Sequence, residues 1–254
     1  MKKLLLLIAI IAGTSLFAQD LSYGLKAGLA YGGGKTTDAD YNSLFKPTVA
    51  FTIGAFAEFK FSDQFAVRPE LNFLQTSFKG TAENVNVNYF ETLLGGPFAV
   101  NNEKTGSRSY LNIPVLLEYY VMDGLSINAG PYISFLMSAK NDGKFLAYVP
   151  TDAYEQAFIA LGYDLDGELN DWVTLSVSDN EDVKDEYKST DIGLALGATY
   201  NLENGMFVDV RYNLGFNDQN DDPDAVGTAS GDLYGQADYA IHNRIAQFTI
   251  GYRF

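Results

Sequence analysis

Hydrophobic and polar residues alternate over eight separate stretches of this chain. In the first stretch, every odd position from Leu21 to Tyr31 is apolar, whereas the even positions hold Ser, Gly, Lys, Gly and Ala. A period of two is typical of a β-strand with one apolar face. The pattern predicts eight strands, at residues 21–31, 48–61, 65–78, 110–121, 125–138, 190–202, 206–216 and 244–254.

The lengths of these strands and of their connections predict the architecture. Each strand has about 11 to 14 residues, and about 9 to 11 residues cross a bilayer at a tilt of about 45°. Connections of about three residues alternate with connections of about 16, 30, 50 and 27 residues. Short turns on one rim and long loops on the other predict an all-β, eight-stranded antiparallel transmembrane up-and-down β-barrel, with long extracellular loops and both termini at the periplasmic rim.

The N-terminus has the features of a secretory signal peptide at residues 1–18. Lys2 and Lys3 precede an apolar run that is about half the length of a spanning helix, and the small residue Ala18 precedes the expected cleavage position. Leu16 is large for the position three residues before this cut, which leaves the cut open by a residue or two. We therefore expect a mature barrel domain at residues 19–254, with a large extracellular loop at 139–190 and an acidic loop at 217–243.

A water-soluble, lipocalin-like barrel also alternates along its strands, so the composition of the polar face has to separate the two classes. A soluble barrel exposes its polar face, where charged residues are plentiful. Here that face is rich in Gly, Ser, Thr and Asn, and its five bases balance five acids, which suits a narrow interior. These ten expected interior residues are Lys26, Glu58, Lys60, Arg68, Glu70, Glu118, Asp191, Asp209, Arg211 and Arg253.

The overall charge is strongly acidic and is concentrated in two connections. The chain of 254 residues has 32 acids, 17 bases, one His and no Cys, and its formal charge is −15 at pH 7. Loss of Lys2 and Lys3 with the signal peptide changes the charge from −15 to −17. Residues 139–190 hold 12 acids and 4 bases, and residues 217–243 hold six Asp without Lys or Arg. This balance argues against nucleic acid as a partner and assigns most of the acidity to extracellular loops.

Three prolines conflict with a regular closed sheet. Pro69, Pro114 and Pro131 fall within predicted strands, and each lacks the N–H that a strand ladder uses. We therefore expect bulges or gaps in the ladder near these residues.

The sequence offers little for catalysis. The single histidine, His242, is close in sequence to Asp238, but such pairs are common in loops, and Gly32–Gly34 opens a loop rather than a phosphate-binding turn. We expect no catalytic residue, no cofactor and no metal site. The acid-rich stretches 164–171 and 217–224 have ligands that Ca²⁺ prefers, but they lack EF-hand spacing and are better explained as solvated loops.

The largest loop has local structure of its own. Asp152 and Glu155 have the spacing of a capping box, which predicts a short helix ending near Gly162. The alternation from Trp172 to Ser178 predicts a strand that extends beyond the bilayer.

Several segments resemble the outer-membrane β-barrel domain family, which includes PorT-like and porin-family proteins and is related in architecture to small OmpA-type barrels of Gram-negative bacteria. The matching segments are RPEL at 68–71, YLNIP at 110–114, AGPY at 129–132, DIGLALGATYNL at 191–202, RYNLG at 211–215 and IGYRF at 250–254. Phe254, with Phe248 and Tyr252 on the same face, resembles the C-terminal signal that the barrel-assembly machinery reads. The resemblance thus implies this machinery and outer-membrane lipid as partners.

Three functions remain open from the sequence. The first is a non-enzymatic outer-membrane barrel with a binding or structural role through its acidic extracellular loops, because eight strands are too few for a wide pore. The second is a narrow porin-like channel for small solutes or cations, which an acidic mouth favours. The third is an accessory role in protein secretion or surface assembly, which rests only on the resemblance to PorT-like proteins.

Overall fold

The computed structural model describes residues 20–36, 45–86, 99–149, 159, 171–221 and 240–254. The predicted signal peptide therefore lies outside the described residues. Among those described, no helix is long and apolar enough to span a membrane. The elements are β1 (Asp20–Thr36), β2 (Phe45–Lys60), β3 (Phe65–Asn86), β4 (Ala99–Met122), β5 (Leu125–Val149), β6 (Asp171–Asp182), the 3₁₀-helix η2 (Lys184–Glu186), β7 (Thr190–Asn201), β8 (Met206–Gly215) and β9 (Ile241–Arg253).

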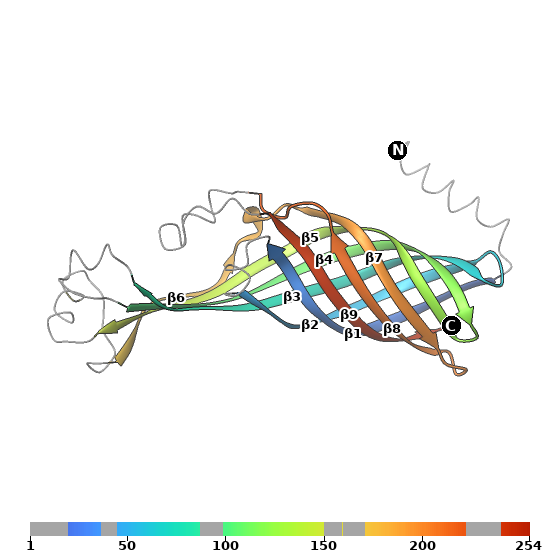
Figure 1. The fold of residues 1–254 in the computed structure, drawn as a ribbon, viewed down its shortest axis with the longest axis horizontal. Helices are drawn as coiled ribbons and strands as arrows, with labels where there is room; N and C mark the ends of the chain where they lie inside the picture. Colours follow the sequence, from blue (N-terminus) through green and yellow to red (C-terminus); the bar gives the residue numbers. More distant parts are fainter. Residues whose placement is uncertain (1–19, 37–44, 87–98, 150–158, 160–170, 222–239) are drawn as a thin grey trace.

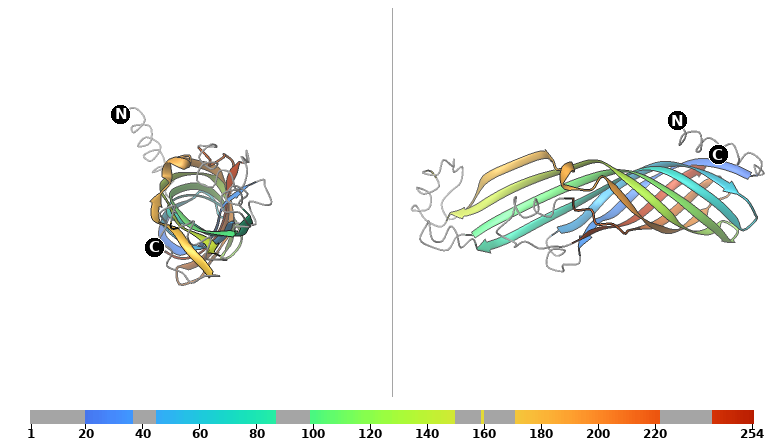
Figure 2. Two further views of the ribbon diagram at one scale, coloured as in Figure 1. Left: turned by 90° about the vertical axis from the view of Figure 1, so that its left-hand side faces the viewer. Right: turned by 90° about the horizontal axis from the view of Figure 1, so that it is seen from above.

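Eight of these strands close into a ring (Figures 1 and 2). Each ring strand pairs antiparallel with its neighbours in chain order, with β6 left out, and the ring closes where β1 pairs with β9 from Gly24↔Arg253 to Thr36↔Ile241. The short turns at one end contain Gly124 and Gly205, whose φ angles are +79° and +83°. The eight-stranded antiparallel barrel predicted from the alternation is confirmed.

The strands on one side continue well beyond the predicted ends. β3, β4 and β5 have 22, 24 and 25 residues, and β6 pairs with the outer part of β5. Together they form a sheet that projects from the barrel (Figure 1). The expected loop 79–109 is therefore largely strand. Its residues lack apolar alternation because a sheet in water does not have to present an apolar row to lipid.

Two expectations concern the large connection after β5. The strand predicted at Trp172 to Ser178 lies within β6 and is confirmed. Of the helix predicted at residues 152–162, only Ile159 is described, in helical conformation. The rest of that helix lies outside the described residues.

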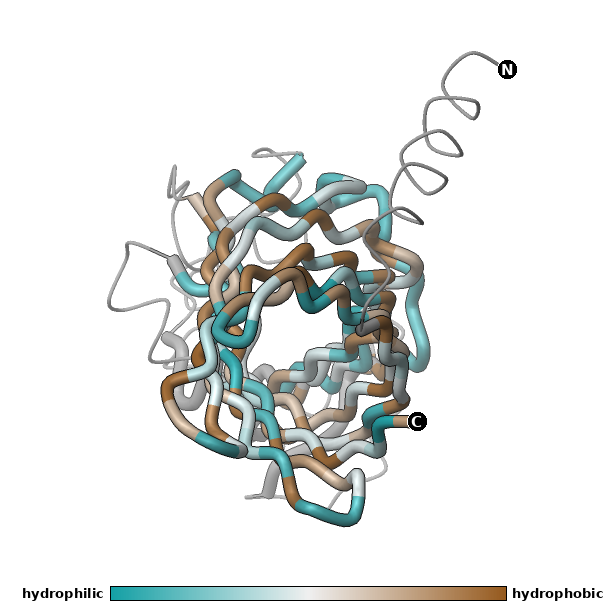
Figure 3. The backbone as a smooth tube through the Cα atoms, turned by 90° about the vertical axis from the view of Figure 1, so that its right-hand side faces the viewer, coloured by the Kyte–Doolittle hydropathy of each residue, from teal (hydrophilic) through white to brown (hydrophobic). Residues whose placement is uncertain are grey.

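The two faces of the barrel wall differ as the alternation predicts. Large apolar side chains such as Leu25, Phe51, Ile127 and Ile250 are exposed on the outside, and hydrophobic and hydrophilic residues alternate along the strands (Figure 3). The inside holds buried Asn, Thr, Ser, Gln and charged residues. An apolar exterior around a polar interior is the arrangement of a membrane barrel, and it is the reverse of a lipocalin-like barrel.

The prolines interrupt the ladders without shifting the register. Between β3 and β4 the pairs step from Pro69↔Val115 to Asn72↔Asn112. Between β4 and β5 they step from Pro114↔Tyr132 to Leu117↔Ala129. Two pairs are therefore missing on each side of β4, and the expectation of ladder gaps is confirmed.

Gly130 lies in the second of these gaps, where β4 and β5 approach closely. A Cβ at Gly130 would collide with the carbonyl oxygen of Val115 and would lie 2.8 Å from its carbonyl carbon. We expect Gly130→Ala to lower the free energy of unfolding by about 1–3 kcal/mol, because two strands have to separate to admit the methyl group. Chemical denaturation in detergent micelles measures this loss.

Gly33→Ala is the matched control, because its added Cβ would lie 3.9 Å from the nearest atom, the Thr76 Cβ. This variant should be close to wild type in stability. Equal losses in the two variants would show that the close approach of β4 and β5 is not the cause.

Candidate functional site in the barrel interior

Six charged side chains from four strands meet inside the barrel. Because alternate residues of a strand share a face, Arg68 and Glu70 of β3 point inward together, as do Asp209 and Arg211 of β8. Lys26 of β1 and Glu118 of β4 complete the group, which we call the charge network. Three cations face three carboxylates, and each side chain is at most 2% exposed.

Arg68 contacts all three carboxylates of the charge network. Its Nη1 lies 2.5 Å from Glu118 Oε1, its Nε 3.0 Å from Glu70 Oε1 and its Nη2 3.2 Å from Asp209 Oδ2. Its guanidinium carbon also lies 5.4 Å from the centre of the Phe56 ring. Such a buried charge is tolerable only because several partners surround it.

Glu70 contacts all three cations of the charge network. Arg211 binds it through both amino groups, with Nη1 to Oε2 at 2.5 Å and Nη2 to Oε1 at 3.1 Å. The Lys26 ammonium lies 2.7 Å from Glu70 Oε2 and 3.7 Å from Asp209 Oδ1. Arg211 Nη2 also donates to Asp209 Oδ2 at 3.0 Å. Together with the contacts of Arg68, these contacts link β1, β3, β4 and β8 across the interior.

The other four residues expected in the interior lie outside the charge network. Arg253 pairs with Glu58 at 2.7 Å, and its side chain is 23% exposed. The Tyr120 hydroxyl donates to Glu58 at 2.6 Å, and the Lys60 ammonium lies 4.9 Å from the centre of the Tyr120 ring. Asp191 belongs to a separate polar group, where it accepts hydrogen bonds from Tyr132 and Asn243 at 3.0 Å each.

Arg108 is an inward-facing cation outside the strands that the alternation predicts. It is 8% exposed, and its guanidinium carbon lies 4.0 Å from the centre of the Tyr187 ring. Residues 79–109 were expected to form a loop, so no face was assigned to Arg108. The alternation of Asn112 and Tyr110, continued by one step, would have placed it inside.

A cluster of buried apolar side chains, which we call the apolar layer, lies toward the extracellular end of the barrel. It consists of inward residues of the wall and Val183, with Tyr187 packed against them, and its members are Ala30, Leu74, Tyr110, Leu136, Ala139, Val183 and Ile245. Val183 and Tyr187 flank η2, in the connection between β6 and β7. This connection thus contributes two side chains to the barrel core.

The connection around η2 is held by backbone hydrogen bonds. Val183 N–H donates to Ala139 O at 3.0 Å, and Lys188 N–H donates to Gln219 O at 2.9 Å. Gln219 N–H in turn donates to Ile241 O at 2.8 Å. Residues 183–188 and 217–221 therefore form one interlocked structure against the outer end of the barrel.

The remaining sequence candidates have ordinary structural positions. His242 lies on β9 opposite Lys35, whereas Asp238 lies outside the described residues. Asp218 Oδ1 accepts hydrogen bonds from the N–H groups of Asn220 and Ile241. In the part of the chain that the structure describes, no three His, Cys, Asp or Glu residues are grouped as metal ligands would be. Residues 164–170 and 222–224 of the two acidic stretches are outside that part.

The aromatic residues of the expected C-terminal signal lie on the outer face of β9 and just after it. Phe248, Tyr252 and Phe254 are 49%, 46% and 62% exposed. The Phe254 N–H donates to Tyr23 O at 2.8 Å, and the two rings stack at 5.6 Å. The last residue of the chain thus contributes to the junction between β1 and β9.

Comparisons with known proteins found similar solved structures and a matching family. No curated protein matches the chain. Solved structures that are similar include Ail, the attachment invasion locus protein of Yersinia pestis, with 12% identity, a TM-score of 0.39 and coverage of 93% of this chain and 100% of Ail. Neisserial surface protein A has 10% identity, a TM-score of 0.37 and coverage of 93% and 100%. OprG of Pseudomonas aeruginosa has 12% identity, a TM-score of 0.33 and coverage of 92% and 95%.

The family assignment rests on a match over most of the chain. The model of the family described as outer membrane protein beta-barrel domain matches residues 17–220. These residues include β1 to β8 and the whole charge network. The chain therefore belongs to the outer membrane protein beta-barrel domain family.

Proposed function

We propose that this outer-membrane protein is a non-enzymatic barrel that conducts no ions and acts by presenting its extracellular strands and acidic connections to a binding partner. The observation that carries the proposal is the charge network, in which buried cations and carboxylates from four strands are paired across the interior. A barrel that served as a pore would need these groups to be solvated rather than paired with one another.

The apolar layer supports the same proposal. Tyr110 and Leu136 are 2% and 5% exposed, and Val183 from the connection around η2 packs with them. Apolar side chains in this layer offer no hydrogen bonds to an ion that leaves the charge network toward the outside, and an ion without such partners is costly to desolvate. Two successive barriers of different chemistry therefore oppose conduction.

The extracellular part of the protein is the candidate region for binding a partner. The outer parts of β3, β4 and β5, together with β6, project beyond the barrel (Figure 1). The expected loop at 139–190 has 12 acids and 4 bases, which gives a net charge of −8. The expected loop at 217–243 has six acids and no Lys or Arg, which gives a net charge of −6. A projecting acidic surface suits a partner that has a basic face.

The proposal predicts a silent protein in planar bilayers. Purified wild-type protein, shown to be folded by anomalous migration of unboiled samples on SDS gels, should leave the baseline current flat over a range of voltages. Stable large single-channel steps would overturn the proposal.

The alternative function, a narrow channel, predicts a different result in the same experiment. Steps that are cation-selective, and that lose selectivity after Asp218→Asn and Asp221→Asn, would support a channel with an acidic mouth. Steps whose cation selectivity is unchanged by these substitutions would count against that alternative.

The resemblance to PorT-like proteins is the basis of a third role, in secretion or assembly of surface proteins. A strain that lacks the gene should then have an altered surface proteome, and an unchanged one speaks against this role. Capture experiments with the intact chain and with residues 150–170 deleted would test whether the large acidic connection selects a partner.

A further inference from the structure

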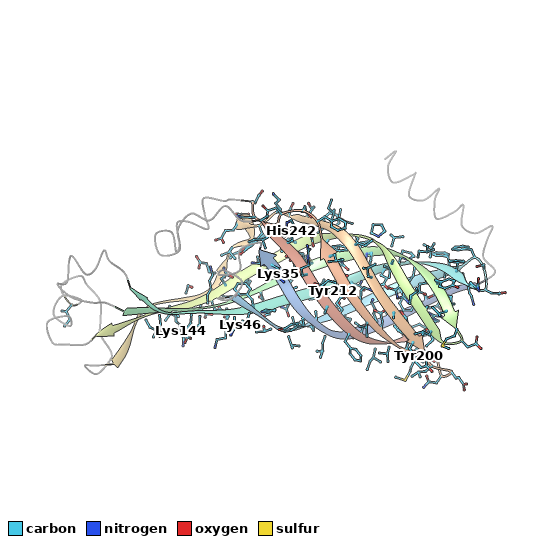
Figure 4. The ribbon with its side chains drawn as sticks, in the orientation of Figure 1. Lys35, Lys46, Lys144, Tyr200, Tyr212 and His242 are labelled. Carbon is cyan, nitrogen blue, oxygen red and sulfur yellow. The ribbon has the colours of Figure 1, made fainter. Side chains whose placement is uncertain are left out.

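Three exposed lysines lie at the extracellular ends of neighbouring strands. Lys35 is near the end of β1, Lys46 near the start of β2 and Lys79 on the outer part of β3. All three are exposed, and Lys46 and Lys79 are direct partners in the β2–β3 register. Lys35 and Lys46 lie beyond Tyr212 and Tyr200, toward the projecting sheet (Figure 4). We call these three residues the lysine belt.

The lysine belt lies just past the apolar band of the barrel. On β1 the last large apolar exposed residue is Tyr31, four positions before Lys35, and on β2 Val49 follows Lys46 by three. At about 3.3 Å per residue, Lys35 and Lys46 lie about 10–13 Å beyond Tyr31 and Val49 along their tilted strands. This is the height at which lipid headgroups begin, and long lysine side chains reach toward such groups.

No carboxylate of the described residues pairs with the belt. The ion pairs of the described chain join interior residues and leave out Lys35, Lys46 and Lys79. Like charges directly opposite each other on two strands are destabilising, so an anion bound beside Lys46 and Lys79 would relieve their repulsion. The grouping is also unusual for a chain with 32 acids and 17 bases.

The belt differs from other charged groups at the two rims of the barrel. The short turns at the opposite rim contain Asp63, Asp123 and Glu203. Arg244, another cation near the extracellular end, already donates to Gly215 O and Asn243 O. Among the described residues, the three lysines of the belt thus lie at this end of the barrel wall without an ion-pair partner, whereas Arg244 is already bound.

We propose that the lysine belt binds the phosphate groups of phosphorylated lipid in the outer leaflet. The proposal rests on the membrane placement of the barrel and adds a ligand to it. An ammonium group donates up to three hydrogen bonds, and its charge is attracted to anionic headgroups. Three lysines on adjacent strands can hold one lipid with two phosphates more firmly than any single lysine can.

Lys144 provides a matched control on the same face of the molecule. It is exposed on β5, further out than Lys46 (Figure 4), and its register partner on β4 is Glu103. Lys144 therefore differs from the belt in its position further out and in having an acid opposite it, where Lys46 has Lys79.

The test measures binding of lipid A with two phosphates to the full chain in nanodiscs of zwitterionic lipid. The triple variant Lys35→Gln, Lys46→Gln and Lys79→Gln should bind it about tenfold or more weakly, because each cation near an anionic headgroup contributes to affinity. Lys144→Gln should bind it as wild type does. Dephosphorylated lipid A should bind equally weakly to all three proteins.

Three results would overturn the proposal. One is unchanged binding by the triple variant, and another is equal binding of phosphorylated and dephosphorylated lipid A by wild type. The third is displacement of the lipid by millimolar inorganic phosphate, which would identify a site for free phosphate instead. Each variant is first shown to be folded by anomalous gel migration. Conductance is recorded in a separate experiment, so a failure of the lipid-binding proposal can be distinguished from a failure of the proposed closed barrel.

Discussion

Replacing Arg68 with methionine is expected to lower the free energy of unfolding by about 3–5 kcal/mol, the range for removal of one partner of a buried ion pair. Arg68 contacts Glu70, Glu118 and Asp209, and its side chain is 1% exposed. Without it, two cations face three buried carboxylates. Denaturant titration of the folded protein in micelles or bilayers measures the loss.

A second substitution separates charge balance from lost packing. Adding Glu118→Gln to Arg68→Met restores two cations against two carboxylates, so the double variant should recover most of the lost stability. Lys60→Gln is the control near the barrel end, because Lys60 is only partly buried, lies outside the charge network, and has a contact with the Tyr120 ring worth about 1 kcal/mol or less. If the double variant is no more stable than the single one, the imbalance of buried charge is not what destabilises the barrel.

Deleting Phe254 is expected to leave most of the protein unassembled in cells while changing the stability of the folded barrel little. The side chain is 62% exposed and contacts Tyr23 and Tyr252 on the outer surface, so it adds little buried area. Its resemblance to a C-terminal assembly signal predicts a defect in recognition by the barrel-assembly machinery. The measurement is the fraction of protein in the outer membrane that migrates anomalously without boiling.

Refolding without the assembly machinery provides the contrast. Purified protein that lacks Phe254 should refold into lipid vesicles to nearly the same yield as wild type. Phe61→Ala is the control in cells, because Phe61 is an aromatic residue of similar exposure at the same rim, 57%, outside the last strand. Equal defects in cells and in vesicles would mean that Phe254 acts by stabilising the β1–β9 junction.

The alternation along the chain was enough to predict the membrane-spanning part of every barrel strand and its two faces. At Leu25 and Lys26, for example, the sequence predicts an outward and an inward side chain, and the structure has the first exposed and the second buried. The prolines were informative as well, since a residue without an N–H cannot donate to a strand ladder, and gaps occur beside Pro114 and Pro131.

The outer ends of the strands could not be predicted in this way. Lys79 to Asn86 and Ala99 to Ser109 belong to β3 and β4, yet they show no apolar row. In water both faces of a sheet can be polar, so the signal that marks a lipid-facing strand is absent there. Arg108 was missed for this reason, and so was the role of Tyr187, whose partner it is.

By itself, the sequence determined which residues face lipid and which face the interior, because a lipid exterior requires an apolar side chain at every second position. Only the tertiary structure decided which interior charges meet. Lys26 and Glu70 are 44 residues apart, and Glu70 and Arg211 are 141 apart. Their contact depends on how the tilted strands are staggered when the barrel closes, and that stagger brings Lys26, Arg68, Glu70, Glu118, Asp209 and Arg211 together while Asp191 joins a different group.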